Sequence, residues 1–79
     1  MPDFKFRLTR HVRERALERG LSLEDVRAVV RAPETVKHLG HGPHGGLRRK
    51  FSKSSGARRM IVVAEIKGKD CWLVTAYYG

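Results

Sequence analysis

The sequence is poor in cysteine, has no long apolar run, and carries no acidic residue between Thr35 and Ala64. Its single cysteine, Cys71, excludes an internal disulfide, and apolar neighbours favour a buried core thiol over a nucleophile. No apolar stretch approaches the roughly 18 residues that a membrane-spanning helix needs, and residues 1–10 contain no signal-peptide core. We therefore expect a soluble, cytoplasmic protein with no membrane partner.

The length and composition predict a single domain over residues 1–79. With 41% hydrophobic residues, the chain can build a core without a metal or a disulfide. A domain of this size buries only roughly 60–65% of its unfolded surface, so its stability margin is small. A homodimer interface would widen that margin, and homodimerisation is an open prediction.

The middle of the chain has charge of one sign only. Seven cationic side chains lie between Thr35 and Ala64, and the formal net charge of the chain is +9. The seven are Lys37, Arg48, Arg49, Lys50, Lys53, Arg58 and Arg59. A surface this positive repels itself unless an anionic partner neutralises it. Clustered Arg and Lys best suit a phosphate backbone, because counterion release supplies the affinity. The alternative is a charge that serves solubility alone.

The first third of the chain predicts a strand followed by a helix. Residues 4–8 alternate apolar and cationic side chains, which is typical of a half-buried strand. Thr9 is placed to cap the N-terminus of a helix over residues 10–19, and Gly20 is placed to end it.

A second helix is expected directly after the first. Ser22 is placed as its N-cap, and the helix stops near Ala32 because Pro33 disfavours helix in the residue before it. Its apolar side consists of Val26, Val29 and Val30. The short connection between the two helices predicts a helical hairpin.

The rest of the chain predicts a β-sheet. Strands are expected over residues 35–39, 47–52, 59–66 and 71–78, separated by segments of turn-forming composition. The predicted fold class is α+β, with the order β-α-α-β-β-β-β. The sheet is expected to be antiparallel, with the N-terminal helical hairpin packed on one face.

The two faces of this sheet differ in charge. Arg48 and Lys50 point one way and Arg49 the other, so either set could line a groove on the uncovered face. In the last strand, strict alternation places Cys71, Leu73, Thr75 and Tyr77 on one face and Trp72, Val74, Ala76 and Tyr78 on the other.

One side of the first helix has the groups that acid–base chemistry at a phosphate needs. His11, Arg15 and Arg19 recur at i, i+4 and i+8 and therefore project from the same side. His11 would lie near the positive helix end, which disfavours its protonation and favours the neutral form that a general base requires. The alternatives are a solvated, salt-bridged helix face and a packing or capping histidine.

Three further histidines, His38, His41 and His44, lie in and beside a glycine-rich loop. No acidic or cysteine fourth ligand lies nearby, so we predict no metal site and no cofactor. The backbone N–H groups of residues 42–46 could approach a phosphate, although the composition first indicates a loop.

The combined motifs resemble a family of small prokaryotic proteins of unknown function. The motifs are H-x-x-x-R-x-x-x-R-G at residues 11–20, A-P-E-T-V at residues 32–36 and V-T-A-Y at residues 74–77. We identify this family as one grouped by fold with the RelE/ParE toxins and the barnase–colicin type of metal-independent ribonucleases. The resemblance covers nearly the whole chain and implies a RelE-like fold.

The resemblance also implies roles for particular residues. In those nucleases a 2′-hydroxyl attacks the adjacent phosphate, which requires an acid, a base and cations. His11 would act as acid or base, Arg15 with Lys50 or Arg48 would hold the phosphate, and Thr75 or Tyr77 would contribute a hydroxyl. The nucleic-acid-binding set is predicted to be Arg19, Arg48, Arg49, Lys50, Lys53 and Arg58.

The leading prediction is therefore a RelE-like toxin that acts as a metal-independent endoribonuclease on RNA. One alternative is a non-catalytic RNA- or ribosome-binding module that uses the same basic surface. Another is a protein-interaction domain whose basic surface binds an acidic antitoxin.

Overall fold

A five-stranded sheet and two helices make up the fold. The computed structural model describes residues 4–79, with the side chain of Ser55 left out of the description. The elements in chain order are β1 (Lys5–Leu8), α1 (Arg10–Arg19), α2 (Leu23–Arg31), β2 (Thr35–His41), β3 (Leu47–Ser55), β4 (Arg58–Lys67) and β5 (Asp70–Tyr78). No helix among the described residues is both long enough and apolar enough to cross a bilayer.

The sheet is mixed, so the predicted antiparallel fold class is wrong. The strand order is β1-β5-β4-β3-β2, and β1 pairs in parallel with β5 while the other three pairings are antiparallel. The register joins Phe6 to Cys71 and Leu8 to Leu73. Both helices lie between β1 and β2 in the chain, and this long connection lets β1 occupy the edge opposite β2. The protein is a small α+β domain.

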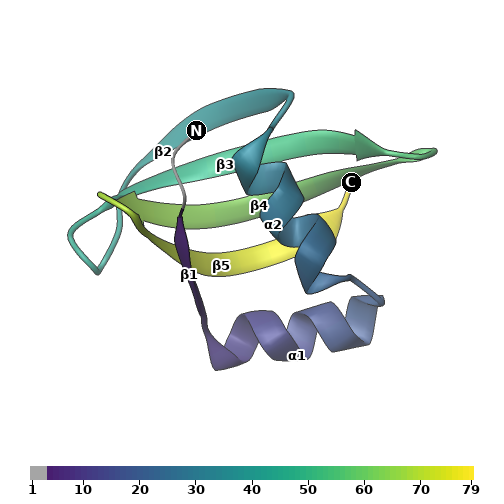
Figure 1. Ribbon diagram of the computed structural model, residues 1–79, viewed down its shortest axis with the longest axis horizontal. Coiled ribbons are helices and arrows are strands. Elements are labelled where there is room, and N and C mark those ends of the chain that lie inside the picture. Colours follow the sequence, from purple (N-terminus) through teal and green to yellow (C-terminus); the bar gives the residue numbers. More distant parts are fainter. Residues whose placement is uncertain (1–3) are drawn as a thin grey trace.

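The two helices contact different strands of the sheet, which corrects the prediction of a helical hairpin that packs as one unit on an antiparallel sheet. The contacts of α1 are with β5, whereas those of α2 are with β4 and β3. Figure 1 shows α2 crossing in front of the sheet and α1 lying beyond the β5 edge. Each helix buries its own apolar side, with Val12 and Ala16 on α1 and the three valines on α2. The core therefore forms between each helix and the sheet.

Local capping interactions fix the ends of α1. The Thr9 hydroxyl oxygen accepts a hydrogen bond from the backbone N–H of Val12 at 3.1 Å, and the same hydroxyl lies 3.3 Å from the carbonyl oxygen of Leu73. At the other end Gly20 adopts a left-handed conformation with φ 65°, which glycine favours. The contact with Leu73 ties the start of α1 to β5.

A β-bulge at Val74 corrects the predicted faces of β5. Val63 of β4 is opposite Thr75, but the next β4 residue, Ala64, is opposite Leu73, so Val74 is an extra residue. The alternation of β5 side chains between the two faces of the sheet therefore restarts after Val74. Cys71, Leu73, Ala76 and Tyr78 share the face that carries the helices, and Trp72, Thr75 and Tyr77 share the other.

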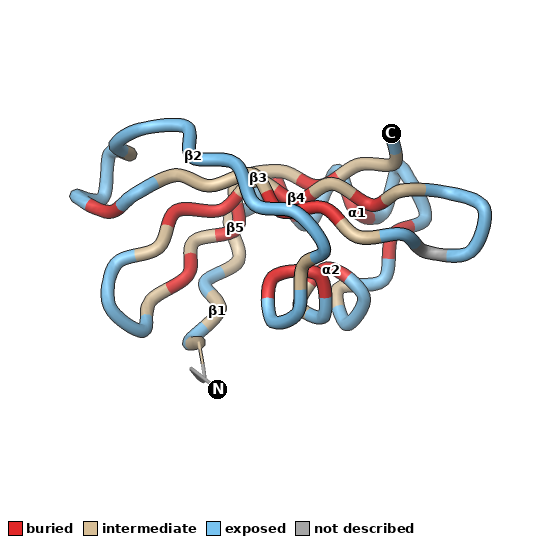
Figure 2. The backbone as a smooth tube through the Cα atoms, turned by 90° about the horizontal axis from the view of Figure 1, so that it is seen from above, coloured by how far each residue is buried: buried red, intermediate tan, exposed pale blue. Residues whose placement is uncertain are grey.

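We call the two faces the helix-side face and the open face. The helix-side face contains buried residues of the three central strands, among them Phe51, Val62 and Leu73. Figure 2 shows the sheet nearly edge-on, with α2 on one side and buried positions concentrated where the two meet. Within residues 4–79, no helix lies over the open face. This face is therefore available for polar and charged side chains.

Candidate functional site

The open face has three rows of side chains that run across the strands. The rows are Thr35, Ser52, Ile61 and Tyr77; Lys37, Lys50, Val63 and Thr75; and Gly40, Arg48, Glu65, Trp72 and Arg7. Cross-strand partners share a face, so the register alone fixes these rows. Cations, hydroxyl groups and aromatic rings thus gather on one surface.

The register decides between the two cation sets that the sequence left open. Arg48 is opposite Glu65 and Lys50 is opposite Val63, so both belong to the open face. Arg49 is opposite Ala64 and Lys53 is opposite Met60, two buried residues of the helix-side face. The predicted nucleic-acid-binding residues of β3 are therefore divided between the two faces.

Arg19 is held against β5 at the edge of the open face. Its Nη1 donates to the carbonyl oxygen of Ala76 at 2.7 Å, and its guanidinium carbon lies 6.0 Å from the ring centroid of Tyr77. Arg58 lies 5.0 Å from the ring centroid of Tyr78, and these four side chains together line a hollow of about 490 Å³. Two predicted binding residues, Arg19 and Arg58, thus lie close to a predicted site residue, Tyr77.

His11 and Arg15 extend this arrangement along α1. Both are exposed, and helical spacing places them on the same side as Arg19. Arg15 lies 3.4 Å from the carboxylate of Glu18. The hydrogen bonds among residues 4–79 include none from His11 to Thr75 or Tyr77. The structure places the four predicted catalytic residues on α1 and the adjacent strand without joining them in a hydrogen-bonded network.

A buried carboxylate, which the sequence analysis did not single out, lies beneath the glycine-rich loop. Glu65 is fully buried, and its Oε2 accepts hydrogen bonds from the backbone N–H groups of His44 and Gly46, each at 2.9 Å. A Cβ at Gly42 would lie 1.9 Å from Glu65 Oε1. Two of the loop N–H groups that were expected to approach a phosphate are therefore directed at a carboxylate of the same chain. The available signal was a single acidic residue within the otherwise apolar run of residues 60–66.

The loop also brings one histidine onto the open face. The His44 ring stacks on Trp72, with centroids 4.5 Å apart and an interplanar angle of 3°. Arg7 lies 6.0 Å from the Trp72 ring and forms a 3.2 Å ion pair with Asp70. Among the residues that the structure describes, no group of three or more His, Cys, Asp or Glu side chains is arranged to hold a metal ion.

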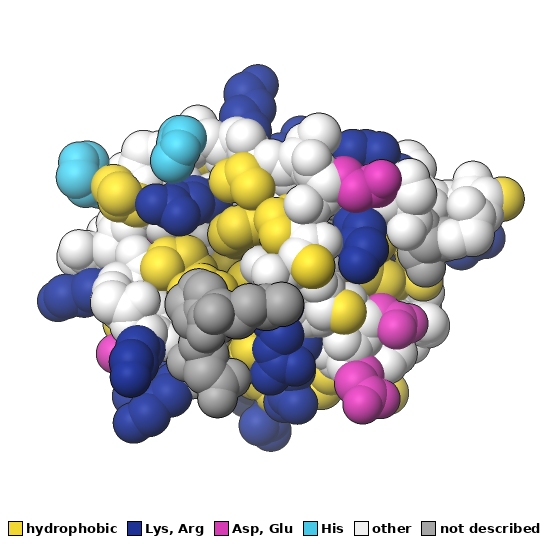
Figure 3. Space-filling model, turned by 45° about the horizontal axis from the view of Figure 1, so that its top comes forward, with side chains coloured by type: hydrophobic (Ala, Val, Ile, Leu, Met, Phe, Trp, Pro, Cys, Tyr) yellow, Lys and Arg dark blue, Asp and Glu magenta, His cyan; other side chains and the backbone are white. Residues whose placement is uncertain are grey.

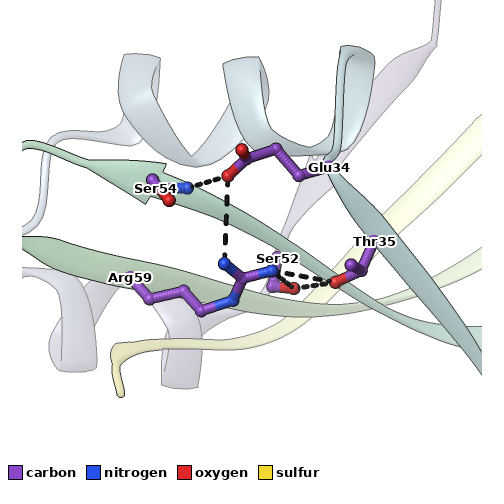
Figure 4. Close-up of polar contacts among 5 residues, drawn as sticks. All are labelled: Glu34, Thr35, Ser52, Ser54 and Arg59. Atoms are coloured by element: carbon purple, nitrogen blue, oxygen red, sulfur yellow. Dashed lines mark hydrogen bonds and ion pairs between the residues drawn. The ribbon is translucent and has the colours of Figure 1, made fainter.

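A polar network joins β2, β3 and β4 near the other end of the open face (Figure 4). Arg59 Nη2 donates to Thr35 Oγ1 at 3.2 Å and to Ser52 Oγ at 3.1 Å, and its Nη1 lies 3.9 Å from Glu34 Oε1. The backbone N–H of Ser54 also donates to Glu34. This hydrogen bond is the main reason that the pKa of Glu34 is lowered, with Arg59 contributing to it. Arg59 is one of the seven cations of the acid-free segment, but it does not belong to the predicted nucleic-acid-binding set.

Cationic and acidic side chains are distributed unevenly over the surface of the molecule. Figure 3 shows the side that bears the helices and the β2 edge, where Lys and Arg side chains project around much of the outline and acidic groups lie mostly on the right. Exposed apolar side chains lie between them. Val36 and Leu39 of β2 are among the exposed large hydrophobic residues.

Comparison with known proteins places the chain in a family without assigning an activity. Searches of curated proteins and of solved structures found no significant match. A family described as a domain of unknown function, DUF4258, matches residues 8–78, which is nearly the whole chain. The protein therefore belongs to the DUF4258 family.

Proposed function

We propose that this protein binds RNA through the open face of its sheet. The observation that carries the proposal is the excess of cations on this face. Lys37, Lys50 and Arg48 lie on two neighbouring strands, and the carboxylate opposite Arg48 is buried beneath the loop. A face with this charge attracts a phosphate backbone and releases counterions when it binds.

Aromatic side chains on the same face favour a nucleic acid over a simple polyanion. Trp72 and Tyr77 both belong to the open face, and the Trp72 ring already bears the parallel ring of His44. Unpaired bases of RNA stack on aromatic side chains, and the phosphates between them bind cations. The combination of rings and cations fits a strand whose bases are not paired.

A second candidate function, metal-independent cleavage of the bound RNA, is favoured by the position of Arg19. This side chain lies against Tyr77, so the α1 side that carries His11 and Arg15 adjoins the open face. His11 would accept the proton of a 2′-hydroxyl while that oxygen bonds to the adjacent phosphorus. The P–O5′ bond would then break to leave a 2′,3′-cyclic phosphate, and the departing 5′-oxygen would take a proton from water or from the Tyr77 hydroxyl. Arg15 and Arg19 would stabilise the charge that develops on the phosphorane.

The motifs resemble a family that we group by fold with the RelE/ParE toxins, and this grouping favours cleavage and a toxin role. An acidic antitoxin would then bind the basic surface and compete with RNA for it. A small adjacent open reading frame that encodes an acidic protein would support this arrangement, and direct competition between the two proteins and RNA would test it.

The test of RNA binding is fluorescence anisotropy of labelled RNA with the purified protein at several salt concentrations. We expect a log–log slope of several units if about five or more phosphates are neutralised. An affinity that does not change between low and physiological salt would contradict the proposal. Parallel incubation of structured and unstructured RNA with EDTA, followed by mapping of the product ends, tests cleavage.

A matched pair of variants tests which face binds. Arg48→Gln/Lys50→Gln removes two charges from the open face, and Arg49→Gln/Lys53→Gln removes two charges of the same strand from the helix-side face. The first variant should weaken RNA binding much more than the second. Circular dichroism melting of both variants checks that each is folded under the binding conditions.

A further inference from the structure

Two lysines face each other directly on the open face. Lys37 of β2 is opposite Lys50 of β3 in the antiparallel register. Like charges at directly opposed positions destabilise a sheet. None of the four ion pairs among the described residues includes either lysine. The register therefore places two cationic side chains side by side on neighbouring strands, and neither has an ion-paired carboxylate among the described residues.

These lysines line a pocket of about 320 Å³. Its other lining residues are Thr35, Val36, Ser52, Arg59 and Ile61. Arg59 thus adds a third cation, and Thr35 and Ser52 add two hydroxyl groups that hydrogen-bond each other. The pocket presents ammonium, guanidinium and hydroxyl groups around a single hollow.

The Arg59 side chain, which lines this pocket, is held in place by its neighbours. Its Nη2 donates to both hydroxyl oxygens, and its Nη1 lies near Glu34. Glu34 is ionised at neutral pH, and the hydrogen bond from Ser54 lowers its pKa further below its ordinary value. Glu34 offsets one of the three positive charges, and the excess at the pocket comes from the two lysines.

We infer that this pocket binds a phosphate group, and that in the protein's proposed function the group is one phosphodiester of the bound RNA strand. Phosphate oxygens accept hydrogen bonds from ammonium, guanidinium and hydroxyl donors, and all three are present. An anion between Lys37 and Lys50 would also remove the repulsion between them. The inference rests on the proposed RNA binding for its physiological ligand, and it adds Lys37 and Arg59 to the binding residues.

The experiment compares two double variants that remove equal charge. Lys37→Gln/Lys50→Gln removes the facing pair, and Lys67→Gln/Lys69→Gln removes two exposed lysines beside the β4–β5 turn. The first variant should lower RNA affinity on the order of tenfold more than the second and reduce the magnitude of the salt slope by at least about 1. Because it removes a like-charge pair, its melting temperature should be unchanged or raised. A clear fall in melting temperature would contradict the unfavourable pairing on which the inference rests.

A titration of the ¹⁵N-labelled protein with inorganic phosphate, against chloride at equal ionic strength, tests the pocket without RNA. We expect the largest amide shifts at pocket residues such as Lys37, Ser52 and Arg59, and their loss in Lys37→Gln/Lys50→Gln. Pocket shifts with phosphate but no RNA binding by the wild type would support a phosphate site and overturn the proposed function. Equal loss of RNA affinity in both double variants, with no pocket shifts, would overturn the inference and leave the proposed function standing.

Discussion

The carboxylate of Glu65 is joined to the backbone N–H of Gly46 by a 2.9 Å hydrogen bond beneath the β2–β3 loop. A second hydrogen bond, from the N–H of His44, reaches the same oxygen atom. A buried carboxylate is costly unless polar partners replace its water. The loop supplies two such partners to Oε2, and in return the carboxylate fixes the loop over one end of the open face. Oε1 is buried without a hydrogen-bond partner among the described residues.

We expect Glu65→Ala to lower the free energy of unfolding by about 3 kcal/mol, because two loop N–H groups lose a charged acceptor in a buried place. Glu65→Gln should cost less, since its amide oxygen can still accept. Urea unfolding measures both. Glu18→Ala, which removes an exposed carboxylate paired with Arg15, is the control and should change stability by less than about 0.5 kcal/mol. Equal effects of the two alanine variants would contradict the anchoring role.

Gly42→Ala should destabilise the protein by about 1–3 kcal/mol, because the new Cβ would lie 1.9 Å from Glu65 Oε1 and force atoms apart. In the Glu65→Ala background the obstructing carboxylate is gone, so the same substitution should cost much less. Urea unfolding of the two single variants and the double variant gives the coupling energy. Additive losses would show that Gly42 is required for some other reason.

His11→Ala should abolish cleavage if the protein cleaves RNA, with a loss on the order of 10²- to 10⁴-fold for a missing acid–base group. The side chain is exposed, so RNA affinity and melting temperature should remain nearly unchanged. Single-turnover cleavage and anisotropy measure the two effects separately. Arg15→Ala is the companion variant, and it should reduce both binding and turnover. Full activity of His11→Ala would place the base elsewhere.

Cys71 should resist thiol reagents while the protein is folded. Burial raises the pKa of its thiol to about 12, so at pH 8 only about one thiol in 10⁴ is ionised. Labelling with Ellman's reagent at pH 8 should be slow in buffer and should reach one thiol per chain in denaturing urea. Rapid, stoichiometric labelling of the folded protein would contradict the buried position.

The contribution of Glu34 to stability should be lost at acid pH. Its pKa is lowered in the folded state, so it stabilises the fold above its ordinary value of 4.5. This stabilisation falls as the pH drops below 4.5 and through the folded pKa. The difference in melting temperature between the wild type and Glu34→Gln should therefore be larger at pH 7 than at pH 3. A difference that does not change with pH would exclude the ionised carboxylate as its source.

Local signals in the sequence were sufficient to locate the helices. Thr9 and Gly20 cap α1 at the predicted ends, because capping depends on residues within one helical turn. Ser22 precedes α2 as predicted, although its side chain forms no capping hydrogen bond. The helical spacing of apolar residues also predicted the buried side of α2. It could not predict which strands each helix contacts.

The arrangement of the strands depended on information that short patterns do not contain. The parallel pairing of β1 with β5 joins distant segments, and no local motif specifies it. The bulge at Val74 reversed the expected faces of Thr75 and Tyr77, because one extra residue resets alternation. In β3 alternation separated Arg49 from Arg48 and Lys50, but it could not tell which set lies on the open face, because that depends on where the helices pack.

The pairing of β1 with β5 has a consequence for the order of biosynthesis. The ion pair between Arg7 and Asp70 spans 63 residues of the chain, so a ribosome must complete most of the domain before β1 can find its neighbour. Contacts at such separation form slowly, since a large loop must close first. During translation the N-terminal segment would therefore remain without its strand partner, and the domain would close only after β5 has emerged.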